Sequence, residues 1–160
     1  MKIALALIVP ALMMGAMASA QDAAPVAAPD GASLYGRCSA CHTATGAGLP
    51  GAFPALNRDV RVMASKPAGR RYLALVVRVG MMGPLTVDGV AYRNVMPAQS
   101  GLDAKDIAAV LNHIGTRISH DGPPFNLFTA AEVTGYLADA AKVAPTDLSA
   151  LHATLSATGG

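Results

Sequence analysis

The sequence predicts an all-α fold that includes one small β-hairpin. Two segments, 68–79 and 103–117, repeat apolar residues at three- and four-residue spacing, which is typical of amphipathic helices. Between them, Asp88-Gly89 separates two short β-prone runs and predicts a two-residue hairpin turn. We therefore expect helices around a compact core, with the hairpin as the only sheet structure.

The first twenty residues are typical of an export signal. Lys2 supplies the positive charge, residues 3–14 are apolar, and Ala18-Ser19-Ala20 matches the A-x-A cleavage pattern. An uncleaved membrane anchor is the alternative, because residues 3–20 are apolar or small throughout. No later apolar run reaches spanning length, so we expect no membrane span after cleavage. Residues 21–30 are rich in Ala and Pro and predict a disordered tether.

The remaining length fits one domain of ordinary size, which we place at 31–118, followed by an extension at 119–160. The formal net charge of the whole chain is only +2, so overall charge gives no indication of nucleic-acid binding. Its distribution is uneven, since seven basic residues face two acidic ones between positions 58 and 93. Such a stretch is either a solvated face or a surface that steers a charged partner.

The elements follow in order along the chain. We expect a short helix over 32–40, an irregular Gly- and Pro-rich segment over 43–57, and a helix over 68–79. Asp103 is a good N-cap for the helix that runs to Arg117. The apolar face of that helix consists of Ile107, Val110, Leu111 and Ile114.

The extension is also expected to be helical. Thr129 followed by Glu132 has the pattern of a capping box, which predicts a helix that runs to about Lys142. Pro145 breaks that helix, and the leucines beyond it suggest one or two further amphipathic turns. The extension is either a lid packed on the domain or a docking element for a partner.

Cys38-Ser39-Ala40-Cys41-His42 is the stretch with the clearest chemistry. C-x-x-C-H is the pattern by which haem c is attached: the two thiols form thioethers with the vinyl groups, and the histidine is the proximal iron ligand. The chain has no other cysteine, so one haem accounts for both. The porphyrin would also add apolar bulk to a chain that has only four Tyr, three Phe and no Trp.

A low-spin electron-transfer haem needs a second axial ligand, and Met96 is the best candidate. Its thioether suits iron, and Pro97 fixes the backbone of a loop that returns to the far face of the haem. Met/His ligation raises the reduction potential. The other methionines, Met63, Met81 and Met82, are expected to be core or loop fillers. His113 is the least unlikely substitute among the histidines, which also include His120 and His152.

Five stretches of the chain, taken together, resemble the class I c-type cytochromes, most of all the bacterial monohaem type that serves periplasmic dehydrogenases as partner or subunit. These stretches are residues 34–42, 48–56, 83–89, 94–98 and 106–111. The resemblance implies the cytochrome c fold, with helices wrapped around one haem and the hairpin before the Met ligand. It also implies that the carbonyl of Pro54 accepts the second ring N–H of His42, with Pro50 as the alternative, and that Leu56 packs on the porphyrin.

The same resemblance implies a periplasmic electron carrier. Its donor would be a flavin, quinoprotein or molybdenum dehydrogenase, and its acceptor a terminal oxidase or another cytochrome. One departure from the family pattern is the stretch 92–95, which replaces the usual small residues before the methionine. Arg93 in this stretch is expected to alter either the contacts of the propionates or the docking face.

Other interpretations of the motif predict different chemistry. Without a sixth ligand, the haem would bind gases or react with peroxide. A C-x-x-C dithiol enzyme would need a βαβ context, and a zinc site would need two more ligands near the motif. Residues 46–51 match G-x-G-x-x-G, but a nucleotide-binding fold requires a strand before that motif and a helix opening on it.

Overall fold

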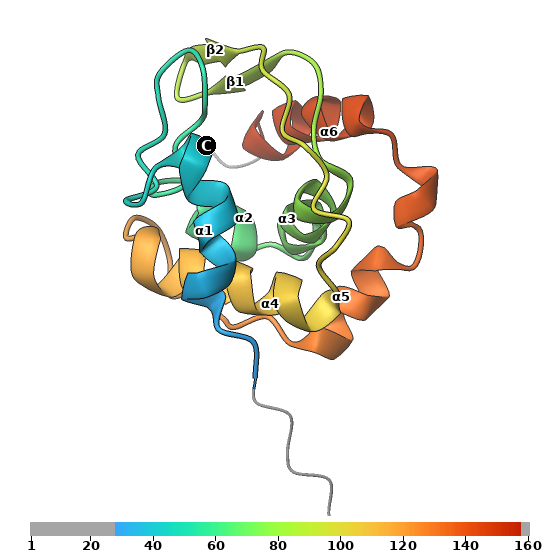
Figure 1. Ribbon diagram of the computed structural model, residues 1–160. Helices are drawn as coiled ribbons and strands as arrows, with labels where there is room; N and C mark the ends of the chain where they lie inside the picture. Colours follow the sequence, from blue (N-terminus) through green and yellow to red (C-terminus); the bar gives the residue numbers. More distant parts are fainter. Residues whose placement is uncertain (1–27, 158–160) are drawn as a thin grey trace, which may run out of the picture.

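Helices form most of the framework, as their periodicity predicted. The computed structural model describes residues 28–157, so the expected export signal lies outside the described residues, as does most of the tether. The α-helices of the described part are α1 (Gly31–His42), α2 (Val60–Ala64), α3 (Pro67–Val79), α4 (Ala104–His113), α5 (Ala130–Leu137) and α6 (Pro145–Ala157). The other elements are strands β1 (Leu85–Val87) and β2 (Val90–Tyr92), a π-helical turn η1 (Ile114–Ile118) and a 3₁₀ turn η2 (Ala140–Lys142). Figure 1 shows α4 below, the hairpin above and α6 beside the hairpin.

The first helix packs against α4, and small residues permit the close approach. A Cβ at Gly31 would collide with the carbonyl of Ala109. Asp30 caps the helix by accepting hydrogen bonds from the second and third backbone amides of its first turn. Tyr35 is buried at the contact, with its ring 5.5 Å from that of His113. The crossing fixes the direction in which the C-terminal end of α1 points.

The hairpin forms at the predicted position. Its strands pair antiparallel with Leu85 opposite Tyr92 and Val87 opposite Val90. The two turn residues, Asp88 and Gly89, both have positive φ, at 51° and 76°. That is the requirement of a type I′ turn, which an Asp-Gly pair satisfies.

The core has two parts, one on each side of α3. The first lies where α1, α4 and α5 meet and includes the fully buried Ile107, Val110 and Val133. The second lies between α3, the hairpin and α6, and includes Leu75 and Leu148. The extension thus contributes buried side chains to both parts.

Several element boundaries differ from those predicted. The first helix covers 31–42 rather than 32–40, so it contains the whole cysteine motif. Helix α2 was not predicted at all. The helix after the N-cap Asp103 is α-helical only to His113 and then widens into η1, whose Gly115 carbonyl accepts a hydrogen bond from Arg61 Nε at 2.9 Å.

The extension also departs from its predicted form. Thr129 does cap α5 through the amide of Glu132, but the Glu132 carboxylate binds Arg70 rather than completing a capping box. Helix α5 ends at Leu137 instead of continuing to Lys142. Helix α6 is longer than the one or two turns expected, and it packs on α3 and β1. Among residues 28–157, no helix has both the length and the apolar character needed to cross a bilayer.

Candidate functional site

The two cysteines occupy the last turn and a half of α1. Their three-residue spacing places both thiols on one side of the helix, and both are half-buried and free of a disulfide. Burial raises the pKa of the Cys38 thiol. Two reduced thiols in this arrangement can each form one thioether with a single flat ligand.

His42, the last residue of α1, is buried and held in one orientation. Its Nδ1 lies 2.8 Å from the carbonyl oxygen of Pro54. Since a carbonyl can only accept a hydrogen bond, Nδ1 carries the proton and Nε2 keeps its lone pair. Burial lowers the pKa of the imidazole, and the bond to Pro54 opposes this only in part. The histidine is thus a neutral side chain with one nitrogen available for a metal.

The loop after α1 brings Pro54 beneath His42. The carbonyl of His42 accepts a hydrogen bond from the amide of Gly48, and Leu49 pairs with Phe53 in an isolated bridge. Gly48 has a φ of +63°, and a Cβ there would collide with the carbonyls of Phe53 and Pro54. Gly48 therefore shapes the loop beside the histidine. The G-x-G-x-x-G stretch at 46–51 follows a helix rather than a strand, so it lacks the context that a nucleotide-binding fold requires.

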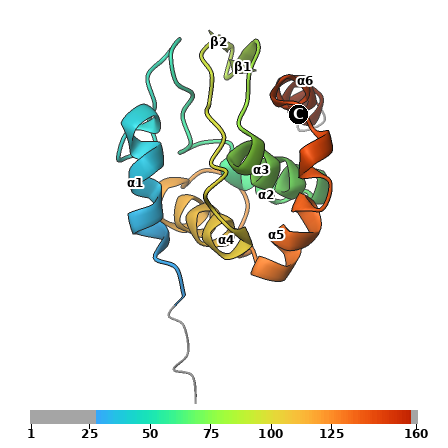
Figure 2. The same cartoon turned by 45° about the vertical axis from the view of Figure 1, so that its right-hand side comes forward.

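A largely apolar cavity separates α1 from α3. Figure 2 shows the two helices standing apart, with the chain between β2 and α4 running between them. The wall contributed by α1 carries Cys38 and His42, and Leu56 lies beside Pro54. The remaining apolar lining includes Leu73, Val76, Val77, Leu85, Val110, Leu111 and Ile114. A second opening on the same cavity is lined by Arg37, Cys41, Phe53, Val95 and Pro97.

Met96 lies in the part of the cavity wall that is formed by the segment between β2 and α4. It lines both openings and is half-buried. Its backbone pairs with that of Met81 in an antiparallel bridge, with both N–H···O distances at 2.9 Å. Gly80 makes this approach possible, because a Cβ there would lie 2.5 Å from the Met96 carbonyl oxygen.

Met81 is the rival that the structure brings closest. It is buried in the part of the core between α3, the hairpin and α6, and it also lines the same cavity. Its sulfur already accepts a hydrogen bond from Tyr72 Oη at 3.6 Å. Burial raises the pKa of Tyr72, so the phenol stays protonated and keeps donating.

The remaining candidates are dispersed. Met82 is 46% exposed, and Met63 is buried at the edge of the cavity. His113 stacks against Tyr35 and is not part of the cavity wall, and His120 is exposed. His152 of α6 does line the cavity, although its sequence position gave no indication of this.

Comparison with known proteins identifies the family. The family model for cytochrome c matches residues 28–117, which is more than half of the chain. The chain belongs to the cytochrome c family. It is 41% identical over 124 residues to a cytochrome c-552 of Thermus thermophilus, covering 76% of this chain and 79% of that protein. A second Thermus thermophilus cytochrome c-552 is 43% identical over 106 residues, covering 65% of this chain and 81% of the relative.

This chain is therefore a class I c-type cytochrome that carries one covalent haem c and transfers electrons. The residues present fit that group. Two reduced cysteines and a neutral histidine with a free Nε2 meet at one end of an apolar cavity, and thioether sulfurs line it. The haem, when bound, supplies an iron that alternates between ferric and ferrous.

Proposed function

We propose that this cytochrome is a periplasmic one-electron carrier whose iron is held by His42 and Met96. The observation that carries the proposal is the arrangement of the two side chains. His42 is fixed by its 2.8 Å contact with Pro54, and Met96 lines the same cavity on a segment pinned by its bridge to Met81. A closed site of this kind favours electron transfer over ligand binding, because neither axial position stays open.

The surroundings of each residue support the part that we propose for it in the haem site. Cys38 and Cys41 are the thioether positions, and Leu56 supplies an apolar contact beside Pro54. Met96 is favoured over Met81 because the sulfur of Met81 already accepts the hydrogen bond from Tyr72. A rigid, preformed ligand set keeps the geometry similar in both oxidation states, which lowers the cost of electron transfer.

The partners are proposed on separate grounds. The export signal in residues 1–20 supports a periplasmic location, where haem is attached to such motifs. The resemblance to cytochromes that serve periplasmic dehydrogenases supports a flavin, quinoprotein or molybdenum enzyme as donor. A downstream oxidase or cytochrome is then the acceptor. Electrons would pass at the rim of the second opening, where Val95 is 53% exposed.

The ligand assignment is tested on protein expressed with the haem-attachment machinery. We expect one covalent haem per chain, a low-spin reduced-minus-oxidised spectrum, and in the ferric form the weak absorption of an iron–methionine bond. Met96→Ala should abolish that absorption, and Met81→Ala should retain it. The reverse result would assign the ligand to Met81. Ready binding of carbon monoxide by the ferrous wild type would show an open site and refute the electron-carrier proposal.

The donor is tested by reduction kinetics. The oxidised cytochrome is mixed with purified dehydrogenases of the three types from the same cell envelope, each with its substrate. Rapid reduction by one of them identifies the donor class. If none reduces it, while a small-molecule reductant does, the proposed dehydrogenase partnership is wrong and the haem site is unaffected.

A further inference from the structure

His152 is a buried ionisable side chain for which the electron-transfer site has no stated use. It lies on α6, is 5% exposed, and is the residue that the extension contributes to the wall of the haem cavity within the described chain. Its imidazole faces the loop before α2 and the ring of Tyr72, whose centroid is 5.7 Å away. A histidine placed there adds a polar, titratable group to an apolar wall.

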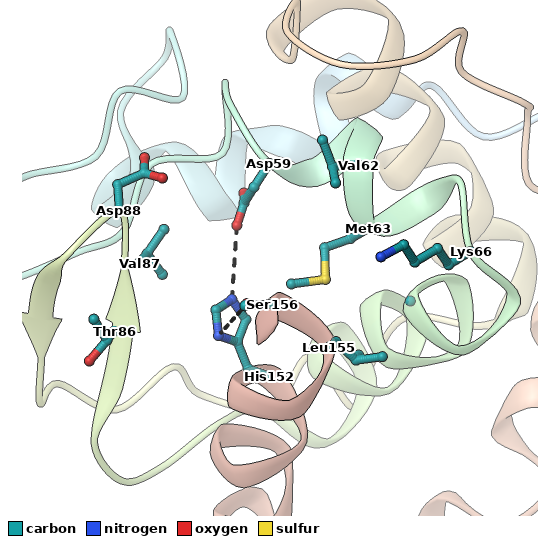
Figure 3. Close-up of a pocket in the computed structure, with 11 residues that line it drawn as sticks. Asp59, Val62, Met63, Lys66, Thr86, Val87, Asp88, His152, Leu155 and Ser156 are labelled. Atoms are coloured by element: carbon teal, nitrogen blue, oxygen red, sulfur yellow. Dashed lines mark hydrogen bonds and ion pairs between the residues drawn. The ribbon is translucent and has the colours of Figure 1, made fainter. Parts of the chain in front are cut away.

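Neither ring nitrogen of His152 makes a short hydrogen bond within the described chain. Its Nε2 lies 3.9 Å from the Asp59 carboxylate, an ion-pair distance that is too long for a hydrogen bond. Its Nδ1 lies 3.4 Å from Ser156 Oγ on the same helix, which is a weak contact. Figure 3 shows the imidazole between these two residues. The Nε2 edge of the ring can therefore bind a further oxygen that enters from the cavity.

A polar pocket adjoins the haem cavity at this point. The two share Asp59, Met63, Val87 and His152. The other polar groups that face the pocket are Lys66 after α2, Thr86 and Asp88 of the hairpin, and Ser156 of α6. Tyr72 of α3 packs against the imidazole itself. The rest of the lining between α1 and α3 is mostly apolar. The polar residues of the second opening, Arg37, Asn94 and Gln99, lie there together with Cys41, so this shared wall is where charged substituents of a ligand held by the cysteines are best accommodated.

Haem c itself has an apolar edge and a charged edge, which matches a cavity that is mostly apolar with a polar pocket at one wall. Its thioether substituents and its two propionates lie on opposite edges of the macrocycle, and the thioether edge is held at Cys38 and Cys41. A haem held in this way would direct its propionates away from α1. Buried carboxylates need hydrogen-bond donors. Among the residues shared by the cavity and the polar pocket, His152 is the one that can donate.

We propose that His152 donates a hydrogen bond to a haem propionate and takes up a proton when the iron is reduced. The inference rests on the proposed haem site. A propionate at the Nε2 edge of the ring would favour the imidazolium, whereas the positive charge that the ferric haem core carries would oppose it. Reduction by a one-electron donor removes that charge, and a proton from solvent then binds the imidazole. The extension thus acts on the electron-transfer reaction through the charge of one residue.

The test measures the midpoint potential against pH. Histidine is the side-chain type at this pocket that ordinarily changes charge between about pH 5 and 8. We expect the ferrous-to-ferric ratio of the wild type, at one fixed applied potential, to fall by roughly three- to tenfold from pH 5 to pH 8. His152→Gln should remove most of this change, and His120→Gln, at an exposed histidine, should retain it.

A second variant separates an electrostatic role from a structural one. His152→Arg keeps a positive charge at every pH, so its potential should stay high and nearly constant across the range. Nuclear magnetic resonance of the His152 ring should show more protonation in the ferrous than in the ferric protein at the same pH. Equal protonation in both states would overturn the proposal.

The experiments distinguish an error about His152 from an error about the haem ligands. If the His152→Gln protein keeps its low-spin spectrum and its iron–methionine absorption but also keeps the wild-type pH dependence, the proton site is elsewhere, for example on the propionate itself. If the wild-type spectrum lacks the iron–methionine bond, the proposed ligand set is wrong. Only the first result contradicts the role of His152.

Discussion

Replacing Arg70 of α3 with methionine should destabilise the protein strongly. The guanidinium lies 2.6 and 2.7 Å from the two carboxylate oxygens of Glu132 on α5. It also donates to the carbonyls of Asn126 and Leu127 at 2.9 and 3.1 Å, and stacks 3.8 Å above the ring of Phe128. Arg70 therefore ties the extension to the haem domain.

The magnitude follows from the pKa of Glu132. The Arg70 guanidinium lowers that pKa from 4.5 to about 2, with further help from the Tyr136 hydroxyl. Because one pKa unit corresponds to about 1.4 kcal/mol, the carboxylate gains about 3 kcal/mol, which partial exposure to water reduces to about 2 kcal/mol. Losing the two backbone carbonyl contacts adds about 1 kcal/mol. We expect Arg70→Met to lower the free energy of unfolding by about 3 kcal/mol.

The assay is denaturant unfolding of the haem-loaded protein followed by circular dichroism. Arg71→Met is the matched control, because the neighbouring arginine makes none of these contacts, and it should cost less than about 0.5 kcal/mol. A loss of under about 1 kcal/mol in Arg70→Met would refute the reasoning. It would also reopen the interpretation of the extension as a separate docking element.

The same pair predicts a pH dependence. The pKa of Glu132 is lower in the folded protein, so its contribution is complete above about pH 4.5 and is lost as the pH falls toward 2. The difference in unfolding free energy between wild type and Glu132→Gln should therefore narrow as the pH falls through this window. A constant difference would mean that the carboxylate charge is not what stabilises the contact.

Three further predictions concern the haem site. Met96→His should lower the reduction potential, since a stronger-field nitrogen replaces sulfur, while Met82→His at an exposed position should leave it unchanged in voltammetry. Gly48→Ala should cost more than about 2 kcal/mol, because its φ of +63° is combined with carbonyl clashes, whereas Gly51→Ala, with open space around it, should cost about 1 kcal/mol in the same unfolding assay. Val95→Asp should slow reduction by the protein donor without changing the spectrum; an unchanged rate would place docking elsewhere.

The sequence predicted the haem-binding end of the site because its parts are local or carry a strong pattern. Cys38 to His42 is contiguous, and the loop that brings Pro54 to the imidazole is only twelve residues long. Met96 was predicted from its thioether and from Pro97, which fixes the backbone of its loop, and its role as the second ligand stays a prediction. His152 could not be predicted, because its place depends on how α6 packs against α3, and no local pattern encodes that packing.

Two local predictions that failed, the α-helical end of the helix after Asp103 and the capping box of α5, share a physical cause, which is competition from tertiary contacts. Apolar periodicity continues from α4 through Ile114 and Ile118, yet the backbone widens where Arg61 takes the Gly115 carbonyl. In α5, the carboxylate of Glu132 belongs to Arg70 instead of the helix terminus. A long-range partner decided both outcomes, and local propensity carries no information about such partners.

In the basic stretch between positions 58 and 93, several arginines bond within the fold instead of being available to a partner. Arg61, Arg70 and Arg78 all donate to backbone carbonyls, and Arg58 lies 3.5 Å from Asp88. Much of the charge that looked available for a partner is thus used within the fold, whereas exposed Val95 lies at the cavity opening together with Phe53 and Pro97. We therefore expect docking to depend mainly on apolar contact. The rate of reduction by the donor should change less than about threefold between roughly 50 and 200 mM salt, and a steep dependence would restore the electrostatic interpretation.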